Sequence, residues 1–86
     1  MDNKEIILAQ LSAAKKVVGA KQTAKAIEKN LALKVYLGND ADKYILNPLL
    51  ELCKNKKMEA DLTCSMAELG KGAGLKVGAA AVAVVG

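Results

Sequence analysis

Residues 17–31 read VVGAKQTAKAIEKNL, and the fold depends on this stretch. Val17 and Val18 predict a short strand, and Gly19 predicts the turn that follows, because glycine tolerates tight turns and lets another backbone come close. Within residues 20–31, apolar and basic side chains each recur at helical spacing, which predicts a helix with two distinct faces. The apolar stripe consists of Ala20, Ala24, Ile27 and Leu31. The basic stripe on another face consists of Lys21, Lys25 and Lys29.

The first turn of this helix is expected to be electropositive. Its leading backbone N–H groups have no partner inside the helix, and the helix dipole places partial positive charge at the same end. The lysines of the basic stripe add full charges around it. We therefore predict that this end of the helix attracts a polyanion.

The net charge of the chain is concentrated around this helix. Residues 15–34 contain six lysines and one glutamate, a charge of +5, whereas the whole chain carries +4, so the remainder sums to −1. A local excess of this kind predicts a docking surface for a negatively charged partner. The alternative, an ordinary solvated helix face, remains open on charge alone. The six lysines are Lys15, Lys16, Lys21, Lys25, Lys29 and Lys34.

The flanking segments predict alternating helices and strands in one domain, residues 1–86. A first helix begins near Asp2 and Asn3, with Glu5 placed for a capping box. Strands are predicted over residues 33–37, 58–62 and 79–85, and the last, the most apolar, is expected to lie at the centre of the sheet. This order predicts an α/β fold, a three-layer α/β/α sandwich with a four-stranded mixed sheet. The apolar face of the first helix consists of Ile6, Ile7, Leu8, Leu11 and Ala14.

Two further helices are expected between these strands. Asp42 is placed to cap the first of them, but Pro48 leaves two alternatives: a kink, or a helix that starts there with Asn47 as its cap. The segment from Ser65 to Glu68 has capping-box spacing and opens a short helix. Residues 70–78, GKGAGLKVG, follow as a glycine-rich loop whose apolar tip is unusual for an exposed segment and predicts a contact surface.

The composition argues against several functions. The chain has no histidine, so the commonest general base is missing, and no serine has a nucleophile context, so we predict no enzyme. Cys53 and Cys64 lack zinc-site spacing and are expected to be free buried thiols, with no metal and no cofactor. Asp40 and Asp42 are better explained as turn and cap residues than as a catalytic or metal-binding pair. No secretory or membrane-spanning segment is visible, so we expect a cytoplasmic protein with no membrane partner and no small-molecule substrate.

Three segments together resemble a known family. Residues 19–25, GAKQTAK, resemble the glycine–lysine motif of the kink-turn RNA-binding ribosomal proteins, the L7Ae/L30e family. Residues 68–78, ELGKGAGLKVG, look like the family's E-L-G-x-A-x-G-x-x-V loop, and the turn at residues 39–42 also fits. The likeness covers nearly the whole chain. Lys21 and Gln22 stand where the archaeal pattern has Asn and Glu, which looks like the bacterial branch of short homologues.

The resemblance implies recognition of kink-turn RNA, in which a helix N-terminus enters the major groove at tandem sheared G·A pairs. It also implies that the loop covers bases flipped out at the kink, and that the partner is a structured RNA, with ribosomal RNA and the ribosome as candidates. The alternative is a protein-interaction module that uses the basic patch against an acidic partner. The predicted site residues are Gly19, Lys21, Gln22, Thr23, Lys25, Lys29, Leu75, Lys76, Val77 and Gly78.

Overall fold

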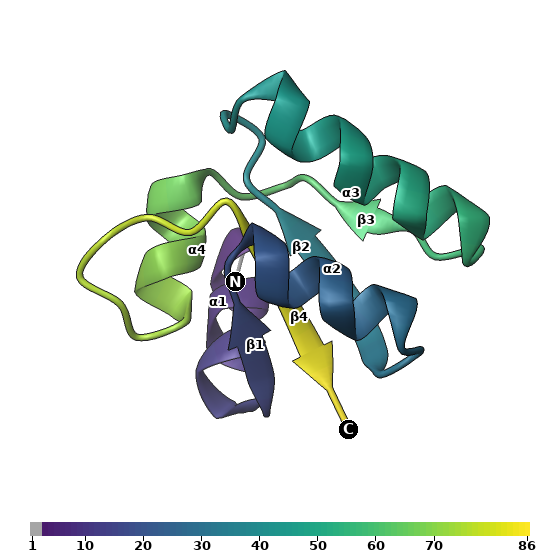
Figure 1. Cartoon of the computed structure of the whole chain (residues 1–86). Coiled ribbons are helices and arrows are strands. Elements are labelled where there is room, and N and C mark those ends of the chain that lie inside the picture. The colour runs from purple at the N-terminus through teal and green to yellow at the C-terminus, as the bar shows by residue number, and fades with distance from the viewer. Residues whose placement is uncertain (1–2) are drawn as a thin grey trace.

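The computed structural model describes residues 3–86, which alternate four helices with four strands (Figure 1). The predicted caps at Asp2 lie outside the described residues. No helix in the described part of the chain is long and apolar enough to cross a membrane. The elements in chain order are α1 (Asn3–Ala13), β1 (Lys16–Val18), α2 (Ala20–Glu28), β2 (Ala32–Leu37), α3 (Lys43–Asn55), β3 (Ala60–Asp61), α4 (Met66–Gly72) and β4 (Ala81–Val85).

The strands form one mixed sheet in the order β1-β4-β2-β3. Strand β4 runs antiparallel to both neighbours, with Val17 opposite Ala83 and Tyr36 opposite Val82, while β2 and β3 run parallel. The predicted central position of the last strand is therefore confirmed. Strand β3 is shorter than the pattern of residues 58–62 predicted.

Helices cover both faces of the sheet, as the sequence predicted. Alternate residues of β2 point to opposite layers: Val35 and Leu37 pack with the core under α2 and α3, whereas Tyr36 packs with the core under α1 and α4. Neighbouring residues of β4, Ala81 and Val82, divide in the same way. The fold is thus the three-layer α/β/α sandwich, with one hydrophobic core on each side of the sheet.

Helix α2 ends earlier than the apolar stripe predicted. Asn30 takes a left-handed conformation with φ 59°, and its N–H donates to the Ile27 carbonyl at 3.1 Å. The N–H of Leu31 donates to the Ala26 carbonyl at 2.9 Å, which completes a Schellman motif. The helix therefore closes after Glu28, and Leu31 is 56% exposed instead of extending the apolar stripe.

Helices α3 and α1 test the predicted helix start and the predicted apolar face. Helix α3 begins at Lys43 and contains Pro48, so the start at Pro48 is wrong, and Asp42 occupies the cap position without a side-chain cap hydrogen bond. Ile6 is 41% exposed, a correction to the predicted apolar face of α1, in which only Ile7 and Leu11 are buried. Both cysteines are buried and neither forms a disulfide bond, as expected.

Helix α4 takes up the first third of the predicted glycine-rich loop. Gly70 and Gly72 are buried helical residues, so the connecting loop spans residues 73–80. A methyl group on Gly70 would collide with the Val77 carbonyl, and one on Gly72 would lie 2.7 Å from the Leu8 side chain. Gly70 is thus required for close packing against backbone rather than for turning, whereas at Gly72 the Leu8 side chain would have to move.

Candidate functional site

One edge of the sheet brings the predicted site segments together. Strands β1 and β2 end there and β4 begins there, because β4 is antiparallel to both. The Gly19 N–H donates to the Ala81 carbonyl at 2.8 Å, and the Gly38 N–H donates to the Ala80 carbonyl at 2.8 Å. These bonds bring the start of α2, the turn after β2 and the end of the loop to the same edge (Figure 1).

The start of α2 is positive and open. Gly19 has φ 103° and ψ 153°, a conformation that side-chain-bearing residues rarely adopt, and an added Cβ would meet no atom within 4 Å. The first turn contains no acidic residue and no side-chain cap. The backbone N–H groups of this turn therefore have no anionic side chain of the helix competing for them.

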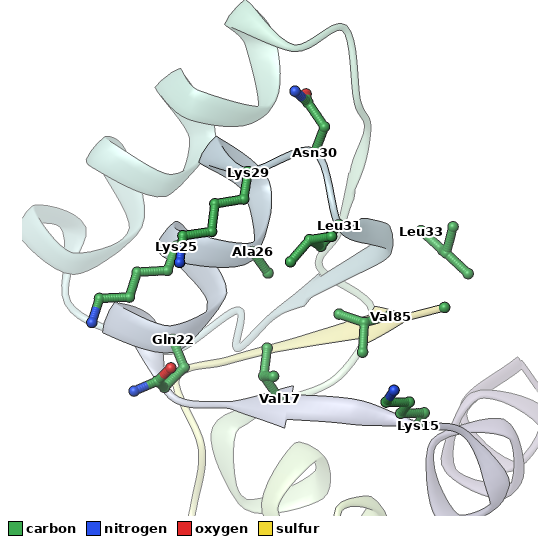
Figure 2. A pocket seen from close by; sticks show the side chains of 11 residues that line it. Lys15, Val17, Gln22, Lys25, Ala26, Lys29, Asn30, Leu31, Leu33 and Val85 are labelled. Carbon is green, nitrogen blue, oxygen red and sulfur yellow. The ribbon is translucent and has the colours of Figure 1, made fainter.

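The α2 side chains form the polar part of this surface. Lys21, Gln22 and Lys25 are exposed, and Lys29, just beyond the helix, is exposed as well. Figure 2 shows Lys25 and Lys29 directed toward the N-terminal end of α2, with Gln22 beside that end. This direction follows from the tilt of helical side chains toward the N-terminus. Within residues 3–86 the only ion pair joins Lys4 to Glu68 at 3.3 Å, so these lysines keep their charge available.

Thr23 is a correction to the predicted site. Its side chain is fully buried, and its hydroxyl oxygen has no hydrogen-bond partner. Its N–H donates to the Gly19 carbonyl at 2.9 Å and closes the first turn of α2. Thr23 therefore supports the helix from inside and does not present a side chain to a ligand.

The charge cluster of residues 15–34 is also less uniform than the sequence suggested. The Lys34 ammonium lies 5.8 Å from the centre of the Tyr36 ring, on the α1 side of the sheet and near Asp61. The Lys16 ammonium donates to the Ala14 carbonyl at 3.3 Å. The basic surface on α2 is thus built from Lys21, Lys25 and Lys29, and Lys34 is not part of it.

The loop of residues 73–80 presents its apolar tip outward. Helix α4 ends in a Schellman motif: Gly74 has φ 81°, and the Leu75 N–H donates to the Gly70 carbonyl at 2.8 Å. Leu75 is 39% exposed and Val77 is 72% exposed. Lys76, which lies between them, and Gly78, which follows them, are exposed as well. The predicted exposure of the apolar tip is confirmed, and its ligand contacts remain a prediction.

The sequence reasoning missed the group that anchors this loop. The Asp40 carboxylate accepts the Met66 N–H at 2.8 Å, and the Asn39 side-chain amide donates to the Leu62 carbonyl at 3.1 Å. The Ala79 N–H donates to the Met66 carbonyl at 3.0 Å and fixes the end of the loop. The acidic turn was visible in the sequence, but its partner lies 26 residues away along the chain.

The capping box of α4 is present as predicted. The Ser65 N–H donates to the Glu68 carboxylate at 2.8 Å, and the Glu68 N–H donates to the Ser65 hydroxyl at 3.2 Å. The backbone N–H of Ser65 lowers the pKa of Glu68, because this hydrogen bond favours the ionised carboxylate. Among residues 3–86, no group of three or more His, Cys, Asp or Glu side chains is arranged to hold a metal ion.

Known proteins resemble this chain in sequence and in fold. An RNA-binding protein of Geobacillus sp. (strain WCH70) is 41% identical over 75 residues, which cover 87% of this chain and 92% of that protein. An RNA-binding protein of Caldanaerobacter subterraneus subsp. tengcongensis is 39% identical over 71 residues, covering 83% and 87%. The solved structure of a Giardia lamblia 15.5kD RNA binding protein has a TM-score of 0.86 at 19% identity, covers 100% of this chain and 77% of that one, and shows likeness of fold alone.

The fold and the edge site define a small α/β/α sandwich protein with a basic helix N-terminus beside an apolar loop. The sequence model of the ribosomal protein L7Ae/L30e/S12e/Gadd45 family matches residues 2–86. The chain therefore belongs to this family.

Proposed function

We propose that the protein binds kink-turn RNA at the edge where α2 begins and the loop of residues 73–80 ends. The observation that carries the proposal is that an uncapped, lysine-framed helix N-terminus and the end of a loop with an exposed apolar tip lie at the same edge. The names of the relatives and the family support RNA as the ligand class. The protein acts as a non-enzymatic binding domain in the cytoplasm, on ribosomal RNA or another structured RNA.

The helix end supplies recognition of base edges. The major groove of a regular RNA helix is too deep and narrow for protein side chains, so a helix N-terminus needs a distorted site such as a kinked internal loop. Lys21 donates to guanine O6 and N7 at the sheared G·A pairs, and Gln22 donates to or accepts from an adjacent base edge. Without arginine in the chain, lysine ammonium groups make these contacts singly instead of as bidentate pairs.

The loop supplies the apolar contact. Leu75 and Val77 cover the faces of bases that the kink leaves unstacked, while Lys76 and the backbone at Gly78 approach the phosphates. Lys25 and Lys29 contact the backbone along the groove, which adds affinity without sequence information. Gly19 leaves open the space that the RNA backbone needs next to the helix.

A gel shift tests the proposal directly. The protein is titrated against a kink-turn RNA and against the same duplex with its G·A pairs replaced by Watson–Crick pairs. We expect much tighter binding to the kink-turn at equal salt, because both RNAs offer similar phosphates and only one offers the distorted groove. Equal affinity for the two RNAs would rule out kink-turn recognition.

A further inference from the structure

A second surface lies beside the C-terminal half of α2, over the end of the sheet opposite to the loop. It is a groove of about 570 Å³ between α2, β1 and the end of β4 (Figure 2). Its apolar lining includes two leucines that solvent reaches freely, Leu31 at 56% and Leu33 at 68% exposed. The other apolar side chains that line it are Val17, Ala26 and Val85.

The charged side chains that line the groove are all positive. Lys15, Lys25 and Lys29 border it, together with the neutral side chains of Gln22 and Asn30. None of the lining side chains is acidic, and the backbone of Gly86 completes the lining. Glu28, the one acidic residue of α2, is not part of the lining and instead lines a separate hollow with α3. The groove therefore combines an apolar floor with a positive rim.

The groove shares Gln22, Lys25 and Lys29 with the proposed RNA surface, but its exposed leucines and Lys15 lie toward the other end of β4. The Val85 N–H donates to the Lys15 carbonyl at 2.9 Å where β4 ends and β1 approaches, whereas the RNA edge lies where β4 begins at Ala81. Among the described strands, β1 pairs only with β4, so no further strand closes the groove on that side. A ligand can thus cover Leu31, Leu33 and Lys15 without reaching the start of β4, where the RNA edge lies.

The chemistry of the lining favours a peptide over nucleic acid. No aromatic side chain lines the groove, so bases would find no stacking surface there. Exposed leucines gain most from covering by other apolar side chains, and the lysine rim attracts carboxylates. We propose that the groove binds a segment of a partner protein in which leucine-like side chains alternate with aspartate or glutamate.

Selection from a random peptide library tests this inference. Peptides of about 12 residues, long enough to fill such a groove, are selected on the wild-type protein and their affinities are then measured by fluorescence anisotropy. We expect enrichment of apolar residues next to Asp or Glu. Leu33→Ser and Lys15→Glu should each weaken the selected peptides roughly tenfold, as central apolar and charged contacts do.

Two matched variants control for general effects. Leu62→Ser removes an exposed leucine elsewhere, and Lys56→Glu reverses an exposed lysine at the end of α3; neither residue lines the groove. Both should bind the selected peptides as the wild type does. The inference would be overturned if the selected peptides lacked apolar residues next to Asp or Glu, or if Leu33→Ser bound them as tightly as the wild type does.

A competition experiment separates this groove from the RNA site. We expect a labelled selected peptide to stay bound when kink-turn RNA is added, and Leu33→Ser to leave RNA affinity unchanged. If the RNA displaces the peptide and Leu33→Ser weakens the RNA complex instead, the groove belongs to the RNA surface. The peptide result stands independently of the gel shift, since it is measured without RNA.

Discussion

The exposed lysines of α2 lie at different distances from the edge of the sheet where the helix begins. Lys21 is in the first turn, beside Gln22, whereas Lys29 follows the last helical residue, Glu28. Both lysines are exposed and carry the same charge, so only their positions distinguish them. The position beside the first turn can reach base edges, and the later position is suited to phosphates.

We predict different outcomes for these two lysines. Lys29→Ala should weaken kink-turn and ordinary duplex RNA alike, and lower the slope of log affinity against log salt by up to about 0.9 for one lost phosphate contact. Lys21→Ala should cost roughly 1–3 kcal/mol of binding free energy, mainly with RNA that keeps its G·A pairs. The test is to measure the affinity of both variants for both RNAs at several salt concentrations. Equal losses for the two variants on both RNAs would mean that the surface is only electrostatic.

The exposed apolar tip of the loop gives a second prediction at this scale. Leu75 and Val77 are 39% and 72% exposed, so replacing both with Ser should change the melting temperature little but weaken binding to kink-turn RNA. Leu62→Ser is the matched control, because Leu62 is also 39% exposed but lies away from the loop. Thermal melts and gel shifts on both proteins give the answer. A large loss of stability would show that the loop side chains belong to the core.

At the level of elements, three helices end in the same way. Helices α2, α3 and α4 each close with a left-handed residue, at Asn30, Lys57 and Gly74 respectively. In each case the next residue's N–H donates to a carbonyl five residues earlier, as for Met58 and the Cys53 carbonyl at 2.8 Å. For α4 this ending sets where Leu75 emerges. The helix end thereby positions the candidate site.

The packing of α4 against its own loop can be tested at Gly70. An added methyl group would collide with the Val77 carbonyl, which is backbone and cannot rotate away. Gly70→Ala should therefore destabilise the fold by on the order of 1–3 kcal/mol, despite the better helix propensity of alanine, and should displace the loop. Lys71→Ala, an exposed neighbour on the same helix, is the control. A denaturation curve for Gly70→Ala that matches wild type would contradict this packing.

At the scale of the whole molecule, one sheet serves two cores. Tyr36 lies in the core under α1 and α4, and Cys53 lies in the core under α2 and α3. Adjacent residues of β2 and β4 point into different cores. If the helices on one face of the sheet unfold, the same strands lose the packing on that face. The two cores are therefore energetically coupled through the sheet.

This coupling predicts a single cooperative unfolding transition. Burial raises the pKa of Cys53, so its thiol should resist modification in the folded state and react on unfolding. Burial likewise places Tyr36 in an environment whose ultraviolet absorbance changes when the core opens. In a denaturant titration, the midpoint from thiol reactivity should equal the midpoint from tyrosine absorbance. Two separated midpoints would show that the layers unfold independently.

The sequence by itself determined the layers and the order of the elements. Helical and strand periodicity are local properties, so the alternation of elements, the central last strand and the Ser65–Glu68 capping box could be predicted from neighbouring residues. The exposure of Leu75 and Val77 was also predictable, because glycines and lysines surround them. The end of α2 could have been predicted too, since Asn30 is a known helix terminator.

Only the tertiary structure decided which distant groups meet. Periodicity placed Thr23 beside the basic stripe, but packing buried its side chain completely. Charge counting placed Lys34 in one patch with the α2 lysines, whereas the alternation of β2 sends it to the other side of the sheet. The bond from Met66 to Asp40 and the groove beneath Leu33 join segments far apart in sequence. Such contacts depend on how strands pair and twist, and no local pattern encodes them.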